Sequence, residues 1–203
     1  YALGGKAGSN ADSHNHNDVG SVTLYRDGRP LLIDVGVETY SKKTFSPQRY
    51  EIWTMQSGWH NLPQFDPDGA KYDQQPGAAF AAADVTVTDA LDGLAMDLAP
   101  AYGSVPGLGR YRRSVHLTDT GLTLREETDY PGTVALTLMS VEKPAVDGNT
   151  VAFGALAAAA VTGADKIVTE AVPITDPRLR QAWPDTLYRT RIYFTQQLSL
   201  VIG

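Results

Sequence analysis

Three of the four histidines in this 203-residue chain lie in two short polar stretches that could bind a metal or transfer a proton. His14 and His16 stand in SHNHND, and His60 stands in SGWHNLP. Imidazole is a common zinc ligand and also acts as a general acid or base near neutral pH. Because the chain has no cysteine, its metal ligands would have to be histidines and carboxylates. The pattern alone leaves open whether His14 and His16 share one metal, have separate roles, or only bond to the loop backbone.

Asp34 is the carboxylate that a hairpin would bring toward these histidines. If the turn in YRDGRP contains two residues, Asp34 lies opposite Ser21. If it contains three residues and ends in a left-handed Gly28, Asp34 lies opposite Gly20, on the same face as His16. A shared site requires the second register. Even then the chain between Gly20 and His16 must bend, because four residues of straight strand span about 13 Å.

The rest of the sequence predicts an all-β fold, a large antiparallel β-sandwich with short helical turns, in a single domain over residues 1–203. Turn sequences such as RDGRP, TDTG and VDGN separate short runs that alternate in polarity or are rich in β-branched residues. SVHLTDTGLTLREE and VTVTDALDGLAMDLAP each predict a hairpin. Helical turns are expected within 45–56 and 175–183, and a long irregular loop over 61–80. The expected strands are 21–25, 31–35, 83–87, 112–117, 122–128, 134–141, 150–153, 166–170, 188–194 and 198–202.

Charge and hydropathy exclude two classes of partner. The net charge of −6 and the pI near 5.1 argue against nucleic acid, because no basic stripe could neutralise phosphates. A local basic patch could still hold an anionic substrate. No run approaches the roughly 20 apolar residues of a membrane span, and GALAAAAV is too short.

A longer stretch carries a family resemblance. SHNHNDVGSVTLYRDGRPLLIDVGVETY, followed by SPQRYEIWTMQSGWHNLP, resembles the C-terminal β-domain of heparinase II/III-like polysaccharide lyases. In that family an H-x-H stretch precedes a hairpin of the form G-x-P-L-L-x-D-x-G, and an H-N pair follows. The similarity is dense over residues 13–63 and continues loosely through YRRSVHL and TDPRLRQAWPDTLYRTRIYF.

The resemblance implies an architecture and a division of roles. An N-terminal (α/α) toroid would precede the β-sandwich, and the active site would lie between them, in a periplasmic or secreted enzyme that cleaves an anionic, uronate-containing polysaccharide by β-elimination. His14 would be catalytic, whereas His16, Asp34 and His60 would bind a structural zinc. The toroid would supply the catalytic tyrosine and the group that neutralises the uronate carboxylate. The domain without its toroid is therefore expected to have little or no activity.

Tyr40, Arg49 and Tyr50 are the candidate substrate-binding residues, because they lie between two of the expected metal ligands. Arg49 could bind a carboxylate or sulfate through two parallel hydrogen bonds. The alternative for Arg49 is a surface ion pair with Glu38 or Glu51.

Five other polar or aromatic residues have a simpler structural interpretation. Asn15 and Asn17 are expected to cap a turn, although they could also orient the histidines. Trp53 is expected in the core, while Trp59 could stack on a sugar. His116 alternates with apolar neighbours and is expected to be a strand residue without a catalytic role.

Two other functions compete with the lyase hypothesis. A metal-dependent cupin also carries H-x-H, but its glutamate would fall on Gly20 or Ser21, so this alternative is disfavoured. A non-catalytic carbohydrate-binding sandwich stays open. It would bind glycan through exposed aromatic residues and would not depend on His14.

Overall fold

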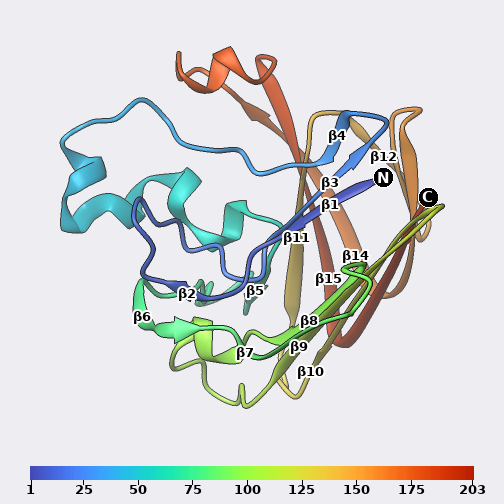
Figure 1. Cartoon of the computed structure of the whole chain (residues 1–203), viewed down its shortest axis with the longest axis horizontal. Helices are drawn as coiled ribbons and strands as arrows, with labels where there is room; N and C mark the ends of the chain where they lie inside the picture. The colour runs from blue at the N-terminus through green and yellow to red at the C-terminus, as the bar shows by residue number, and fades with distance from the viewer.

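A computed structural model describes all 203 residues, and its regular elements are strands and short 3-10 helices. Figure 1 shows the strands gathered on one side of the molecule and a lobe of loops and helical turns on the other. The strands are β1 (Ala2–Gly5), β2 (Ser9–Asn10), β3 (Val22–Arg26), β4 (Arg29–Leu32), β5 (Pro63–Phe65), β6 (Gly77–Ala81), β7 (Ala83–Val87), β8 (Gly93–Asp97), β9 (Tyr111–Thr118), β10 (Gly121–Thr128), β11 (Val134–Ser140), β12 (Pro144–Asp147), β13 (Thr150–Phe153), β14 (Ala157–Pro173) and β15 (Thr186–Ile202). The 3-10 helices are η1 (Lys43–Phe45), η2 (Pro47–Glu51), η3 (Trp53–Met55), η4 (Ser57–Trp59), η5 (Ala99–Tyr102) and η6 (Leu179–Gln181).

The strands form an all-β, antiparallel sandwich, which confirms the predicted fold class. The main sheet has ten strands, with the order β12-β13-β14-β15-β10-β9-β8-β7, and β11 and β5 continue it from β15. A three-stranded sheet, β1-β3-β4, packs against it, and β2 pairs with β6. No helix in the structure is long and apolar enough to cross a membrane.

The long strand β15 turns the main sheet from one layer into the other. Its residues 197–202 pair with β10, whereas its residues 188–194 pair with β11. Between these parts Gln196 has a φ of 64°, and Gly163 on β14 has a φ of 89°. A Cβ on Gly163 would lie 2.4 Å from the carbonyl oxygen of Gln197, so only glycine fits this bend.

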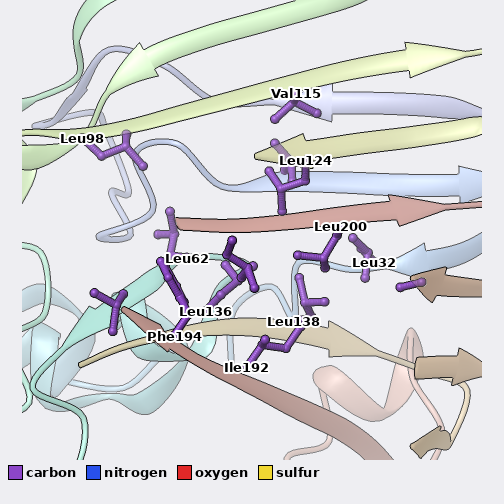
Figure 2. Close-up of a cluster of buried hydrophobic side chains, with 14 of the residues drawn as sticks. Leu32, Leu62, Leu98, Val115, Leu124, Leu136, Leu138, Ile192, Phe194 and Leu200 are labelled. Carbon is purple, nitrogen blue, oxygen red and sulfur yellow. The ribbon is translucent and has the colours of Figure 1, made fainter. Parts of the chain in front are cut away.

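The core fills the space between the layers. The alternation of buried and more exposed residues along β9, β10 and β15 directs one side of each strand inward, whereas β11 is buried on both faces. Burial of apolar area of this kind is the main favourable contribution to folding. The residues labelled in Figure 2 sample the core: Leu32, Leu62, Leu98, Val115, Leu124, Leu136, Leu138, Ile192, Phe194 and Leu200.

The β3–β4 hairpin does not have the three-residue turn that a shared site is expected to require. The turn contains two residues, Asp27 and Gly28, with φ values of 50° and 73°, so Gly28 is left-handed as predicted but the three-residue turn is wrong. A bulge at Leu31 then shifts the pairing, so that Leu24 lies opposite Leu32. The extra residue, and not the turn, changes which side of the chain Asp34 occupies.

Most of the predicted elements are present, but β1 and β12 are not predicted, the strand 166–170 is only part of β14, and three further boundaries differ. The second strand of the opening hairpin is Arg29–Leu32 and ends before Asp34, whereas the sequence predicts 31–35. The predicted strands 188–194 and 198–202 are parts of one continuous strand. The predicted loop 61–80 contains β5, which pairs with β11, and most of β6. In each case pairing with a distant segment decides the boundary, which local propensity does not encode.

Candidate metal centre and active-site histidine

Burial alternates along the H-x-H stretch, which follows a turn closed by the N–H of Asn15 on the carbonyl of Asp12. Asn15 and Asn17 point inward and are buried, whereas His14 is exposed and His16 is partly exposed. The Asn17 side chain donates to the carbonyl oxygen of Gln74 at 3.0 Å. Both histidines therefore project from the outer side of a segment that the asparagines anchor.

Further hydrogen bonds attach this segment to the helical lobe. The backbone N–H of Asn17 donates to the carbonyl of Met55, and the amide of Asn15 donates to the Tyr50 hydroxyl at 3.2 Å. Arg49 Nε donates to the carbonyl oxygen of Asn15 at 2.8 Å. The expectation that Asn15 and Asn17 only cap a turn is thus wrong, because both are buried anchors of the histidine segment.

His60 is buried, and its two ring nitrogens have different partners. Nε2 lies 3.1 Å from the carbonyl oxygen of Thr54, which can only accept, so Nε2 carries a proton. Nδ1 lies 3.0 Å from Oδ2 of Asp34, and the other Asp34 oxygen accepts the N–H of Gly36 at 2.7 Å. A backbone carbonyl that fixes one ring nitrogen as the donor leaves the other available as a metal ligand.

Asp34, His16 and His60 converge at one point. One ligand atom from each lies within 4.8 Å of the others, and the two imidazole rings are 5.4 Å apart. Two imidazoles and one carboxylate, with one position left open, form a donor set that suits zinc. These three residues fit the metal site that the sequence predicts.

The electrostatics of the three side chains suit a cation. Burial and the nearby His60 hold the pKa of His16 below its usual value, so its imidazole is disposed to stay neutral. Burial works against the charged form of His60, but the hydrogen bond and charge of Asp34 outweigh it and raise the pKa of His60. Burial would also raise the pKa of Asp34, yet its contacts with His60 and Gly36 hold it well below the usual range. The contact between them therefore favours the protonated imidazole of His60 together with the ionised carboxylate of Asp34.

Asn61 joins the two strands of the hairpin at the metal centre. Its buried amide donates to the carbonyl of Val22 at 2.7 Å and to that of Ile33 at 3.1 Å. Ile33 precedes Asp34, and Asn61 follows His60. One side chain therefore fixes the relative position of two of the three candidate ligands.

His14 lies apart from the three candidate metal ligands. Its imidazole is exposed, and its ring stacks on Tyr40 with the centroids 6.2 Å apart and the planes 8° from parallel. His14 has a φ of 58°, a left-handed backbone that costs a non-glycine residue about 1 kcal/mol or more. Such strain is found preferentially at functional sites.

The comparison with known proteins identifies the family. The family model described as heparinase II/III-like, C-terminal, matches residues 2–198. The chain belongs to this family. A search of curated proteins gave no match.

Solved structures similar to this heparinase II/III-like domain share its fold. A heparinase III described as the BT4657 gene product, with methylated lysines, aligns with a TM-score of 0.66 and 17% identity over 98% of this chain and 32% of that chain. A second heparinase III structure aligns with a TM-score of 0.62 and 21% identity over 94% of this chain and 30% of that one. A mutant of heparan sulfate lyase HepC from Pedobacter heparinus aligns with a TM-score of 0.64 and 14% identity over 98% of this chain and 32% of that chain. The chain thus spans about one third of the length of these structures.

The candidate substrate-binding residues of the heparinase II/III-like domain occupy two environments. Tyr40 is exposed beside His14, whereas Tyr50 contacts Asn15. Arg49 donates to the carbonyls of Asn15 and Thr44, so the alternative of an ion pair with a glutamate is wrong. Glu38 instead accepts from Trp53, and Glu51 pairs with Lys43. Contact of Tyr40, Arg49 and Tyr50 with substrate stays a prediction.

The remaining aromatic candidates contribute to packing. Trp53 and Trp59 are partly buried and meet edge to face at 5.0 Å beside the smaller apolar cluster. Arg189 covers the Trp59 ring at 3.9 Å. His116 lies on the exposed side of β9.

Two buried amides that hold the site, Asn61 and Gln74, have structural roles that the sequence pattern does not predict. Gln74 accepts the N–H of Val19 and donates to its carbonyl at 2.7 Å. The position of Asn61 directly after His60 was the one signal available for it, whereas nothing near Gln74 in the sequence indicates its role.

Proposed function

We propose that this domain forms one side of the active site of a polysaccharide lyase that cleaves a uronate-containing chain by β-elimination. An N-terminal (α/α) toroid forms the other side, and the isolated domain has little or no activity. Family membership supports the reaction class, and the similar structures, which are about three times as long as this chain, support a second domain.

The observation that carries the proposal is the separation of the two histidines of H-x-H. His16 turns to Asp34 and His60, whereas His14 stacks on Tyr40 with its imidazole exposed. If both histidines coordinated one metal ion, neither imidazole would be available to a substrate. The two histidines are two residues apart, so alternation alone would direct them to the same side; the left-handed backbone of His14, with a φ of 58°, accompanies their separation.

The chemistry needs a group such as His14. In the elimination a base removes the C5 proton, and the released electron pair forms the C4–C5 double bond. The C4–O glycosidic bond then breaks, and the leaving oxygen takes up a proton. The C5 proton is acidic only when the adjacent carboxylate is neutralised. An imidazole in this position serves as the base or as the partner of the carboxylate.

The metal that we propose is zinc, in a structural role. His16, Asp34 and His60 would hold it, and bound zinc would crosslink the histidine segment, the end of the β3–β4 hairpin and the end of η4. His14 is two residues from His16, so the crosslink would keep it oriented toward the cleft.

The test is His14→Ala in the complete protein that contains this chain, with His116→Ala as the control. His14→Ala should reduce formation of unsaturated products, followed by their ultraviolet absorbance, by about 100-fold or more, the usual contribution of a general acid or base. His116→Ala should leave the rate unchanged. Glycan binding without unsaturated products, equal in both variants, would instead favour a non-catalytic carbohydrate-binding module.

A further inference from the structure

A short excursion between β14 and β15, residues 174–185, contacts the segment that leads from Asp34 to Tyr40. Figure 1 shows the excursion in orange-red, projecting above the blue segment. The Asp176 carboxylate accepts the N–H of Thr39 at 3.1 Å, and the Trp183 indole donates to the carbonyl of Val35 at 2.8 Å. The excursion therefore fixes the approach to Tyr40 at two points.

The excursion carries an exposed arginine to the aromatic side chain beside His14. The guanidinium carbon of Arg178 lies 4.5 Å from the centroid of the Tyr40 ring. Tyr40 is 41% exposed, and its ring also contacts Phe45, which is 68% exposed. His14, Tyr40, Phe45 and Arg178 thus form one exposed cluster from three separate parts of the chain.

Arg178 has no carboxylate partner. It is exposed and belongs to none of the ion pairs of the structure. The nearest acid in sequence, Asp176, accepts the backbone N–H groups of Thr39, Arg178 and Leu179. A guanidinium stacked on an aromatic ring keeps its N–H edge free to bind two oxygens of a carboxylate or a sulfate.

We propose that Arg178 binds an oxyanion of the polysaccharide, a carboxylate or a sulfate, on a sugar next to the one that reacts at His14. Both groups contact the Tyr40 ring, so the distance from guanidinium to imidazole is at most the sum of their two distances to that ring, about the length of a disaccharide. This inference rests on the proposed lyase function and adds a residue that determines specificity for charge.

The test uses the complete protein with His14→Ala to prevent turnover, and calorimetry with three oligosaccharides of equal length. One carries carboxylates and sulfates, one is desulfated, and one is also carboxyl-reduced and therefore neutral. Arg178→Gln should weaken binding of the charged ligands about tenfold or more, the usual effect of losing a charge-assisted hydrogen bond. It should leave the weak binding of the neutral ligand unchanged. A loss that persists with the desulfated ligand identifies the carboxylate, and a loss confined to the sulfated ligand identifies the sulfate.

Arg180→Gln is the matched control, because Arg180 is exposed in the same turn and its side chain bonds only to the Trp183 carbonyl. Equal weakening by Arg178→Gln and Arg180→Gln would reveal only general charge attraction and overturn the proposal. Equal weakening of all three ligands by Arg178→Gln would show that Arg178 only supports Tyr40, which also overturns it. If the protein without Arg178→Gln binds none of the oligosaccharides, the proposed function fails together with the inference.

Discussion

The guanidinium of Arg113 and the carboxylate of Glu126 form an ion pair that is completely buried, with Nε 2.9 Å from Oε1. Arg113 Nη1 also donates to the carbonyl oxygens of Gly20 at 2.6 Å and of Asn61 at 2.8 Å. Gly20 ends the histidine segment, and Asn61 follows His60. The pair on β9 and β10 therefore connects the main sheet to both histidine-bearing parts of the candidate metal centre.

Arg113→Met should destabilise the chain by about 3–5 kcal/mol, because it leaves the Glu126 charge buried without a partner. Urea unfolding measures the loss. Arg112→Met is the control on the neighbouring, partly exposed residue and should change stability by less than about 0.5 kcal/mol. The double variant Arg113→Met/Glu126→Leu should be more stable than Arg113→Met alone. If it were less stable, the unpaired Glu126 charge would not be the cause of the loss.

Zinc should bind the purified chain and raise its stability. At a free zinc concentration 100 times the dissociation constant, the gain is about 2.7 kcal/mol. His16→Ala should abolish that gain, whereas His14→Ala should retain it. Metal analysis and melting with and without a chelator provide the readout. Equal loss in both variants would mean that the two histidines share the ion, which would contradict the division of roles.

Without metal, His16 and His60 should affect the free energy of unfolding on opposite sides of the usual histidine pKa of about 6.5. The raised pKa of His60 gives stability that is present below pH ~6.5 and is lost as the pH rises through its folded-state value. The lowered pKa of His16 gives stability that is present above pH ~6.5 and is lost as the pH falls through its folded-state value. Urea unfolding between about pH 5 and 9 in a chelator should show both losses. In His16→Gln the loss of stability below pH ~6.5 should be smaller than in the unchanged protein. An equal loss in both proteins would refute this account.

The left-handed backbone of His14 predicts that glycine at this position is more stable than alanine, although both variants lose the imidazole. His14→Gly should stabilise the chain by up to about 1 kcal/mol relative to His14→Ala, because glycine adopts a positive φ without strain. Both variants of the complete protein should lose lyase activity. Equal stability of the two variants in urea would show that the segment relaxes when the imidazole is removed.

The sequence by itself determined the fold class and the composition of the site. Turn residues between short alternating runs predict antiparallel strands. The fold class could be predicted because both the turn residues and the alternation are patterns of neighbouring residues. The resemblance in residues 13–63 named His16, Asp34 and His60, and these are the side chains that the fold brings together.

The tertiary structure decided the features that depend on distant partners. The bulge at Leu31 could not be read from the turn sequence, because pairing with β3 fixes it. Met139 on β11 donates its N–H to Asn61, so packing against β11 holds the amide between Val22 and Ile33.

Arg178 meets Tyr40 only because the excursion between β14 and β15 folds back onto the segment after Asp34. Local patterns specify which way each side chain points along its own strand. Contacts between segments far apart in sequence depend on register, bulges and loop packing, which only the folded chain sets.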